Sequence, residues 1–459
     1  MNNPSQKPWS WLTELFRSEV RQKTERQIGL EIERIAMWKD GQPFRYKTSE
    51  SNGVERPGAG QLLQKLHQAY GWKLVDSHSG QPIGLETPTG KVSLEPGSQL
   101  EFALFPHQSL FEVEELLRDY DAQVDQIIQP WKGLCFLGLA VNPLNRVNEI
   151  DVIPSPRYAI MTDVLGKTGK LGTSMMRRTS SVQINLDYTS EKEAIEMLRV
   201  SLLLAPISTA LFANSPFLDG KPSGFLSTRS EIWRNTDPMR TGLLNEAFTM
   251  GFDFEAYAKL LWNLPLMFVQ NDQHEFVNAN LCSLKQIAEG KLPGVSINPI
   301  NCRSAVQQLF TEARLKPGYV EVRSVDGQLP AYRLASAAFW MGILYDQEAR
   351  KKAFELLGHL SAKDRNELLV ATSIKGLKAE FKELKVLQVA QALVSCAEQG
   401  LIKRGKKEES FLSCLKENVS KGLSPADKLL ESFDKRWNRD ILQMLKSCHL
   451  TIEKTVGEA

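Results

Sequence analysis

The sequence predicts an α+β protein with a helical C-terminal region, and three observations carry this prediction. Short runs with the two-residue period of β-strands alternate with helical segments through about residue 340. After about residue 345 the strand signals end and only helical periodicity continues. The 459 residues are 42% hydrophobic and 24% charged, which is typical of globular chains that bury a sizeable core. We therefore predict a main α+β domain at residues 1–345 and a helical region packed on it at residues 346–459.

Six segments bounded by Gly, Pro, Asn or Ser are predicted to be strands. They span residues 27–38, 91–96, 99–105, 135–141, 179–188 and 319–326. Four longer segments have the 3.6-residue period of helices. They span residues 60–71, 109–128, 190–213 and 331–357. The presence of both kinds of segment before residue 345 is what a mixed α+β fold requires.

Two stretches of the C-terminal region have a predicted local structure. In LSPADKLLESF, Ser424 is placed to cap a helix, Pro425 suits the first helical position, and Asp427 completes a capping box. In IKRGKKEES, residues 402–410, acids follow bases, so this stretch is predicted to be a solvated connector.

Charge and composition argue against nucleic acid and membranes as partners. The formal net charge of +2 gives no reason to expect a clustered basic face. The longest apolar run, from Val200 to Ala213, is interrupted by Ser and Pro and is shorter than the roughly 20 residues of a bilayer span, so it is predicted to be a buried helix. The N-terminal stretch lacks the features of a signal peptide, which predicts a cytoplasmic protein. The 6 cysteines include no C-x-x-C pair, which is typical of reduced thiols rather than of disulfides or a zinc site.

Acidic and amide side chains gather on one face of several predicted strands. Alternation places Glu31 on the same face as Glu33, and Glu101 follows a turn that begins after Glu95. Gln183 lies in the segment 179–188, and Glu321 shares a face with Arg323 in the segment 319–326. Each of these faces, taken alone, suits the solvated side of an antiparallel sheet. If these four segments, with residues 91–105 counted as one, share one sheet, the carboxylates converge, and two of them 4 Å apart repel by about 4 kcal/mol at an effective dielectric constant near 20.

A converging set of carboxylates needs cations. Oxygen ligands without paired His or Cys favour Mg²⁺, with Mn²⁺ as the alternative, over zinc. Because Mg²⁺ held by carboxylates usually also holds phosphate, the pattern indicates metal-dependent phosphoryl chemistry on a sheet. The stretch GKTGKLGTS, residues 166–174, lacks the G-x-x-x-x-G-K-[ST] spacing of a phosphate loop. It is predicted to be a mobile loop near the site.

Eight stretches of the chain resemble the glutamate–cysteine ligases of the plant and proteobacterial type. In chain order they are IGLEIE, SLEPGSQLE, PRYAIM, SMMRRTSSVQINLD, ALFANSPFLDGKPSGFLSTRSEIWRNTDPMRTG, FTEARLKPGYVEVRSVDG, AFWMGILYD and LSPADKLLE. The resemblance implies a curled antiparallel sheet flanked by helices, similar to the glutamine synthetase catalytic fold, with residues 1–345 as the catalytic domain. It also implies that ATP and Mg²⁺ serve to join the γ-carboxylate of L-glutamate to the amine of L-cysteine through γ-glutamyl phosphate, the first step of glutathione biosynthesis.

The resemblance further implies roles for individual residues. The stretches place a metal-facing set at Glu31, Glu33, Glu95, Glu101, Gln183 and Glu321. Arg157 and Arg229 match arginines that engage glutamate. Arg323 matches a partner of the phosphate or acyl phosphate, and it is expected to act in catalysis together with Glu321.

Two alternatives to this activity stay open. A carboxylate–amine ligase of the same family could use a different amine, because the fold and the metal site do not fix the acceptor. A non-catalytic homologue that binds or regulates is the second alternative, and the acids present in all four strand segments argue against it. The expected partners are glutamate, cysteine and ATP, without nucleic acid or membrane, and the protein is expected to be a monomer or a homodimer.

Overall fold

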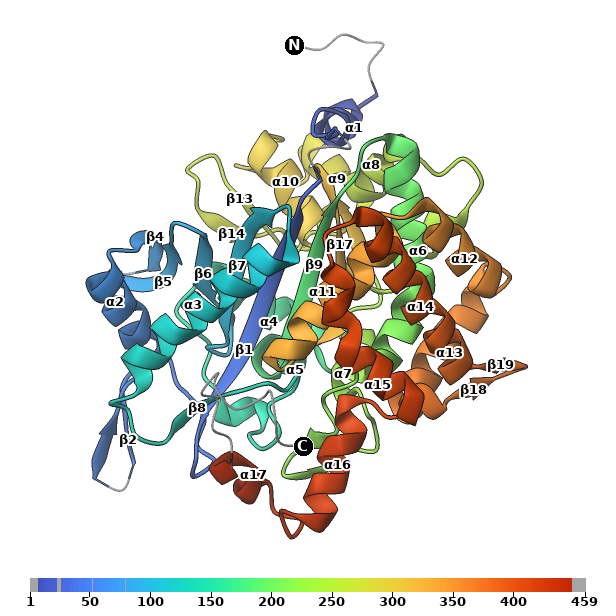
Figure 1. Cartoon of the computed structure of the whole chain (residues 1–459). Coiled ribbons are helices and arrows are strands. Elements are labelled where there is room, and N and C mark those ends of the chain that lie inside the picture. The colour runs from blue at the N-terminus through green and yellow to red at the C-terminus, as the bar shows by residue number, and fades with distance from the viewer. Residues whose placement is uncertain (1–6, 23–25, 52, 79, 448–459) are drawn as a thin grey trace.

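A nine-stranded antiparallel sheet forms the centre of the computed structural model, which describes residues 7–22, 26–51, 53–78 and 80–447 (Figure 1). Eight strands follow one another in the order β16-β17-β9-β1-β7-β6-β5-β4, and β8 pairs with the far end of β1. The strands of this sheet are β1 (Ile28–Trp38), β4 (Lys73–His78), β5 (Gln81–Glu86), β6 (Gly90–Leu94), β7 (Leu100–His107), β8 (Leu134–Leu137), β9 (Ser181–Asp187), β16 (Ala313–Lys316) and β17 (Tyr319–Asp326).

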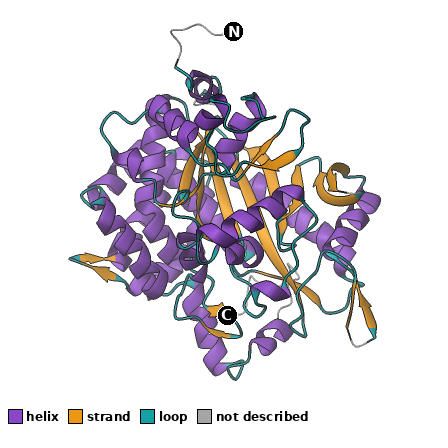
Figure 2. Ribbon diagram, turned by 180° about the vertical axis from the view of Figure 1, so that it is seen from behind, coloured by secondary structure: helices purple, strands orange, loops and turns teal. Residues whose placement is uncertain are grey.

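Helices surround the sheet on both sides (Figure 2). They are α1 (Ser10–Arg17), α2 (Ala59–Tyr70), α3 (Leu110–Ile128), α4 (Pro156–Thr168), α5 (Gly172–Arg178), α6 (Glu191–Leu211), α7 (Thr228–Arg234), α8 (Phe254–Asn263), α9 (Leu284–Ala288), α10 (Pro299–Gln307), α11 (Pro330–Leu344), α12 (Gln347–Leu357), α13 (Ala362–Lys375), α14 (Val386–Arg404), α15 (Ser413–Lys421), α16 (Pro425–Lys435) and α17 (Ile441–Ser447). Short two-stranded pairs lie outside the sheet: β2 (Ser49–Ser51) with β3 (Val54–Arg56), β10 (Phe217–Leu218) with β11 (Lys221–Pro222), β12 (Thr241–Gly242) with β15 (Phe310–Thr311), β13 (Phe268–Gln270) with β14 (Phe276–Asn278), and β18 (Glu380–Phe381) with β19 (Leu384–Lys385).

One face of the central strands is apolar and packed. Leu30, Ile184 and Val320 are completely buried, and α6 and α11 contact the strands that carry them. Among the described residues, α6 is the one helix long and apolar enough to cross a membrane, yet 89% of its apolar window is buried inside the protein. It is therefore the core helix that the run beginning at Val200 predicts.

The predicted α+β class is confirmed, and each of the six predicted strands overlaps a strand of the sheet. Three other strands of the sheet, β4, β5 and β16, were not predicted. The alternation of β4 and β5 is interrupted by polar residues, Pro or Gly, and β16 alternates but is only four residues long, so all three lack the strongest strand signal.

Two local predictions were wrong. The helix expected at residues 331–357 is divided into α11 and α12, because the Asp346 carboxylate accepts a hydrogen bond from the Ala349 amide (2.8 Å) and starts a new helix. The segment 166–174 is not a mobile loop, since it forms the end of α4 and the beginning of α5. A Cβ atom added at Gly169 would lie 2.0 Å from the Thr236 carbonyl oxygen, which shows how closely this segment is packed.

The C-terminal helices share one hydrophobic core with the sheet. Leu357, Leu393 and Leu415 belong to the same buried cluster as the apolar residues of β1 and β9. The capping box at Ser424 and Asp427 is confirmed. The division into domains at residue 345 stays a prediction.

The predicted connector at residues 402–410 is anchored by a buried acid rather than fully solvated. Glu408 is completely buried. Its carboxylate accepts a hydrogen bond from the Leu110 amide (2.9 Å) at the beginning of α3 and pairs with Arg404 (3.0 Å). The sequence pattern of acids after bases did not predict this contact, because it depends on a strand–helix junction about 300 residues earlier in the chain.

Candidate active site

A cavity of about 290 Å³ lies over the polar face of β1, β7, β9, β16 and β17. Eight of the nine predicted site residues line it: Glu31, Glu33, Glu95, Glu101, Arg157, Gln183, Glu321 and Arg323. Helices α4 and α5 and the segment around residues 307–310 complete its wall. The polar strand faces are thus the lining of a cavity and not a solvated side of the sheet.

The register of the sheet brings the acids together. Glu31 of β1 pairs with Gln183 of β9, and Glu33 of β1 pairs with Glu101 of β7. Side chains of directly opposed residues project from the same face of an antiparallel sheet, about 5 Å apart at Cβ. A shift of one residue in either pairing would turn the acids of that strand into the apolar core, so the register itself positions the site.

The acids on β1 and β7 are hydrogen-bonded mainly to neutral donors. Asn185 donates to Glu31 (2.8 Å), and Gln183 donates to Glu33 (2.9 Å). The Ser93 hydroxyl donates to Glu101 (2.6 Å). Among the described residues, none of these three carboxylates forms an ion pair within 4.0 Å of a basic side chain. Their negative charge is therefore not neutralised by direct contact with the protein.

Burial and mutual repulsion raise the pKa values of these acids. Burial, followed by the charges of Glu321 and Glu101, raises the pKa of Glu31 to about 7. Burial and then the charge of Glu33 raise the pKa of Glu101 to about 7. The pKa of Glu33 is also raised, mainly by burial, although Arg229 and Arg323 oppose that effect. Near neutral pH Glu31 and Glu101 therefore hold protons that ordinary surface acids have lost.

The fourth acid, Glu95, is presented by a tight turn between β6 and β7. The turn is closed by the bond from the Glu95 amide to the Gln99 carbonyl (2.9 Å). At Gly97 the turn passes so close to α5 that an added Cβ would lie 2.3 Å from the Arg177 carbonyl oxygen. The Tyr158 hydroxyl donates to Glu95 (3.4 Å), and burial followed by the charge of Glu101 raises the pKa of Glu95 to about 8.

The chemistry of this donor set fits a hard divalent cation. The carboxyl groups offer oxygen donors, their mutual repulsion raises their pKa values, and the Oδ1 atom of Asn185 is buried without a hydrogen-bond partner among the described residues. In the side-chain arrangement of the described residues, no group of three acidic, His or Cys side chains is placed to hold a metal ion. The acids bond to Asn185, Gln183 and Ser93 instead, and they would have to turn from these neighbours to share a cation.

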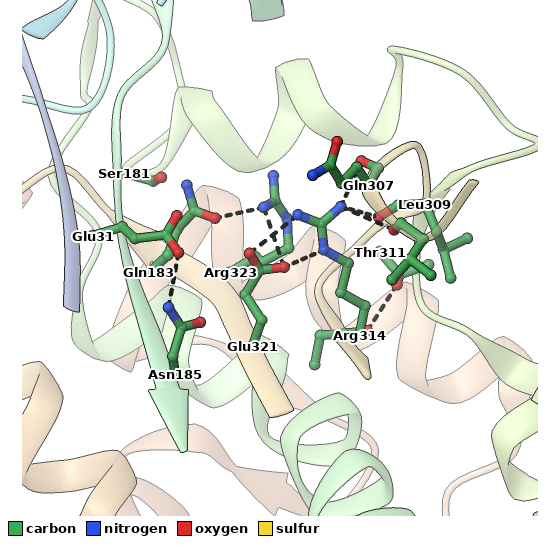
Figure 3. A network of polar contacts seen from close by, with 12 residues as sticks. Glu31, Ser181, Gln183, Asn185, Gln307, Leu309, Thr311, Arg314, Glu321 and Arg323 are labelled. Atoms are coloured by element: carbon green, nitrogen blue, oxygen red, sulfur yellow. Dashed lines mark hydrogen bonds and ion pairs between the residues drawn. The ribbon is translucent and has the colours of Figure 1, made fainter. Parts of the chain in front are cut away.

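The opposite end of the cavity is cationic. Arg314 of β16 pairs with Glu321 of β17, with its Nε atom on one carboxylate oxygen and its Nη2 atom 3.1 Å from the other (Figure 3). Burial alone would raise the pKa of Glu321, but Arg314, Lys316 and Arg323 outweigh it and hold that pKa far below its usual range. Glu321 is thus ionised and already neutralised, unlike the four acids at the other end. Its predicted contact with a metal ion stays a prediction.

Arg323 lies between the two ends of the cavity. Its Nη1 atom donates to the Oε1 atom of Gln183 (2.5 Å) and lies 3.6 Å from Glu321. Its guanidinium also lies over the ring of Trp233, 5.2 Å from the centroid. These contacts fix the orientation of Arg323 across the cavity floor.

The two arginines expected to engage glutamate are in different positions. Arg157 lines the cavity, and its Nη2 atom donates to the Tyr158 hydroxyl (2.9 Å). Arg229 does not line the cavity. It donates to the Arg323 carbonyl oxygen (2.9 Å) and lies 4.0 Å from the buried Asp326. Arg229 therefore supports the strand that carries Arg323, and its predicted contact with glutamate stays a prediction.

Arg314 and Lys316 are cavity residues that the sequence analysis missed. Both belong to β16, a four-residue strand whose alternation points Ala313 and Leu315 into the core and the two basic residues toward the cavity. The signal was the same alternation that singled out Glu321 and Arg323, but four residues are too few for a strand prediction from one sequence.

A buried sheet surface with converging acids at one end and converging bases at the other defines an enzyme that moves charged groups, with phosphoryl transfer as the best match. The comparisons with known proteins agree. The family model described as glutamate-cysteine ligase family 2 matches residues 28–446. The chain belongs to this family.

Curated relatives match nearly the whole chain. The chloroplastic glutamate–cysteine ligase of Arabidopsis thaliana is 34% identical over 432 residues, which is 92% of this chain and 79% of the relative. The corresponding protein of Nicotiana tabacum is 36% identical over 432 residues, again 92% of this chain and 79% of the relative. Among solved structures, glutamate–cysteine ligase of Francisella tularensis in complex with AMP has a TM-score of 0.58 at 14% identity, covering 92% of this chain and 87% of that one. This likeness confirms the fold.

Proposed function

We propose that the protein joins the γ-carboxylate of L-glutamate to the amine of L-cysteine in an ATP-dependent reaction that passes through γ-glutamyl phosphate. The observation that carries this proposal is the cavity with two oppositely charged ends, built by a chain of the glutamate–cysteine ligase family. Phosphoryl transfer between anions depends mostly on positioning and on charge neutralisation, and both ends of the cavity serve those needs.

In this proposal the acidic end holds Mg²⁺, or Mn²⁺ in its place. The ligands are Glu31, Glu33, Glu95 and Glu101, with Gln183 and Glu321 as the remaining members of the set. A cation held by these residues would supply charge neutralisation to the phosphate oxygens of ATP and would keep the carboxylates ionised. The acids whose pKa values are raised must lose their protons to become ligands, so cation binding is coupled to proton release.

The first chemical step joins glutamate to the phosphoryl group. An oxygen of the γ-carboxylate attacks the γ-phosphorus of ATP, and the bond to the bridging oxygen breaks with its electron pair leaving on ADP. Arg323, held by Gln183 and Trp233, neutralises oxygens of the group in transit. Arg157 binds a carboxylate of glutamate, because its planar guanidinium suits two carboxylate oxygens.

The second step forms the amide. The neutral amine of cysteine attacks the acyl carbon, the C–O bond breaks, and phosphate leaves with the electron pair and takes up the proton that the amine loses. The cavity wall also includes Met161, Met175, Met176 and Phe310, whose apolar surface excludes water from the acyl phosphate.

ADP release by the purified protein tests this function. We expect release to require Mg²⁺ and glutamate, and to be fastest with cysteine among a panel of amino-acid amines. Release that needs glutamate but prefers another amine would keep the mechanism and change the product. Absence of release with every amine, from a protein shown to be folded by circular dichroism, would favour the non-catalytic alternative.

Two further expectations stay predictions. The protein is expected to be a monomer or a homodimer, which sedimentation of the purified chain measures. A cytoplasmic location was expected from the sequence, whereas the names of the plant relatives place those proteins in the chloroplast. Fractionation of source cells distinguishes the two compartments.

A further inference from the structure

Lys316 is the last residue of the edge strand β16 and lines the cationic end of the cavity. Its neighbour in the strand, Leu315, is completely buried in the core, and its partner in the pairing with β17 is Tyr319. The backbone of Lys316 is itself fixed, because its carbonyl oxygen accepts a hydrogen bond from the buried hydroxyl of Tyr188 (3.2 Å). The strand therefore directs the side chain of Lys316 to the cavity.

The charges around Lys316 are unbalanced. Arg314 is neutralised by Glu321, and Arg323 donates to Gln183. The ammonium group of Lys316, by contrast, forms no hydrogen bond or ion pair with any residue of the described part of the chain. Lys316 is partly buried in the cavity wall, and a cation that loses hydration without gaining a partner is costly, so its position is explained if a ligand supplies the missing anion.

The net charge of this end of the cavity indicates which anion fits. Three bases, Arg314, Lys316 and Arg323, line this end, and Glu321 is the one acid among the described residues that forms an ion pair with any of them, which leaves two positive charges without a directly paired acid. A phosphoryl group with two negative charges matches this excess, whereas a single carboxylate would leave one positive charge uncompensated.

We propose that the Lys316 ammonium group binds the phosphoryl group that passes from ATP to the γ-carboxylate of glutamate. This role rests on the proposed ligase function. Lys316 donates hydrogen bonds to the phosphoryl oxygens while the bond to ADP breaks and the bond to the carboxylate oxygen forms, and it keeps its proton throughout. A compact ammonium group on a flexible stem can follow the phosphorus atom, which the rigid and already paired guanidinium of Arg314 cannot do.

Steady-state kinetics of Lys316→Gln test the proposal. We expect kcat for ADP formation to fall about 100-fold, as for the loss of one preorganised donor to a transition state. The KM values for glutamate and cysteine should stay within about threefold of the wild type, because only the phosphoryl contact is lost. The kcat of Lys316→Arg should be at least about tenfold higher than that of Lys316→Gln, since arginine restores the positive charge and a hydrogen-bond donor. The matched control is Lys221→Gln, which removes one exposed positive charge on β11, outside the cavity lining, and should leave kcat unchanged.

The outcomes separate this role from the alternatives. A rate for Lys316→Gln within threefold of the wild type would overturn the proposal, and so would a loss expressed in the KM for glutamate, because Lys316 would then hold the substrate carboxylate. Unfolding of both Lys316→Gln and Lys316→Met would overturn it too, since the ammonium group would then stabilise the fold. A wild-type protein that forms no ADP would instead refute the ligase function itself.

Discussion

Replacement of Arg314 by Met tests the charge balance of the cationic end. Arg314 and Glu321 are 7% and 2% exposed at their side chains, so the pair is out of reach of solvent. Arg314→Met keeps much of the apolar length of the side chain and leaves the Glu321 carboxylate buried without its main partner. The substitution also removes two hydrogen bonds, from Nη1 to the carbonyl oxygens of Gln307 (2.7 Å) and Leu309 (2.7 Å), which tie the end of α10 to the sheet.

The expected loss is about 3–5 kcal/mol in the free energy of unfolding, the usual cost of removing one partner from a buried ion pair. Part of the electrostatic attraction on Glu321 remains in this variant, because Arg323 lies 3.6 Å from it and Lys316 is nearby. The loss is therefore expected at the lower end of that range. The surface control Arg118→Met removes an exposed partner of Glu114 and should cost less than about 1 kcal/mol. Urea denaturation followed by tryptophan fluorescence measures both values.

The pH dependence of the same measurement provides a second check. The pKa of Glu321 is depressed in the folded protein, so its stabilising contribution is present above the unfolded value near 4.5 and is lost as the pH falls below it. The difference between the wild type and Arg314→Met should therefore be largest at neutral pH and shrink below about pH 4. A loss under about 1 kcal/mol at pH 7, or one that does not change with pH, would contradict the buried ion pair.

Three further predictions concern the acidic end. Burial and mutual repulsion raise the pKa values of Glu31 and Glu101 to about 7 and that of Glu95 to about 8, so the folded protein binds more protons than the unfolded chain between about pH 5 and 8. Without metal the free energy of unfolding should fall as the pH rises through that window. Urea denaturation in the presence of EDTA measures this free energy. A free energy of unfolding that rises with pH would be inconsistent with the acid cluster. Mg²⁺ should raise the melting temperature more at pH 8 than at pH 6, and its binding should release protons, which titration calorimetry in two buffers of different ionisation enthalpy detects. Equal shifts of the melting temperature at both pH values, without proton release, would exclude these acids as ligands. Gly97→Ala should lower kcat at least about tenfold, because its Cβ would push the Glu95 turn away from α5; unchanged kinetics would mean that the turn need not be held there.

The acid cluster was predictable because its residues follow the two-residue alternation of β-strands. Glu31 and Glu33 occupy alternate positions of one long strand, and Gln183 and Glu321 each lie on the polar face of another strand. Alternation reveals which side chains share a face, but it does not reveal register. The convergence in one cavity depends on pairings such as Glu33 with Glu101, which the chain makes between strands about 70 residues apart.

The parts that escaped prediction depend on tertiary contacts. The basic residues of β16 belong to a strand that only its pairing with β17 defines. The pairing of Arg314 with Glu321 and the position of Arg229 behind Arg323 are side-chain contacts that no local pattern indicates. The close packing of Gly169 likewise arises from a segment almost 70 residues later, so a stretch rich in Gly and Lys was mistaken for a mobile loop.

The transfer of an oxygen atom from glutamate to phosphate tests the central claim most directly. Glutamate labelled with ¹⁸O in its γ-carboxylate is incubated with the protein, ATP, Mg²⁺ and cysteine, and the inorganic phosphate is analysed by mass spectrometry. The proposed reaction predicts that one ¹⁸O atom appears in each phosphate released, because a carboxylate oxygen becomes the bridging oxygen of the acyl phosphate and leaves with phosphorus. Amide formation with unlabelled phosphate would contradict the γ-glutamyl phosphate intermediate and the role given to the cationic end of the cavity.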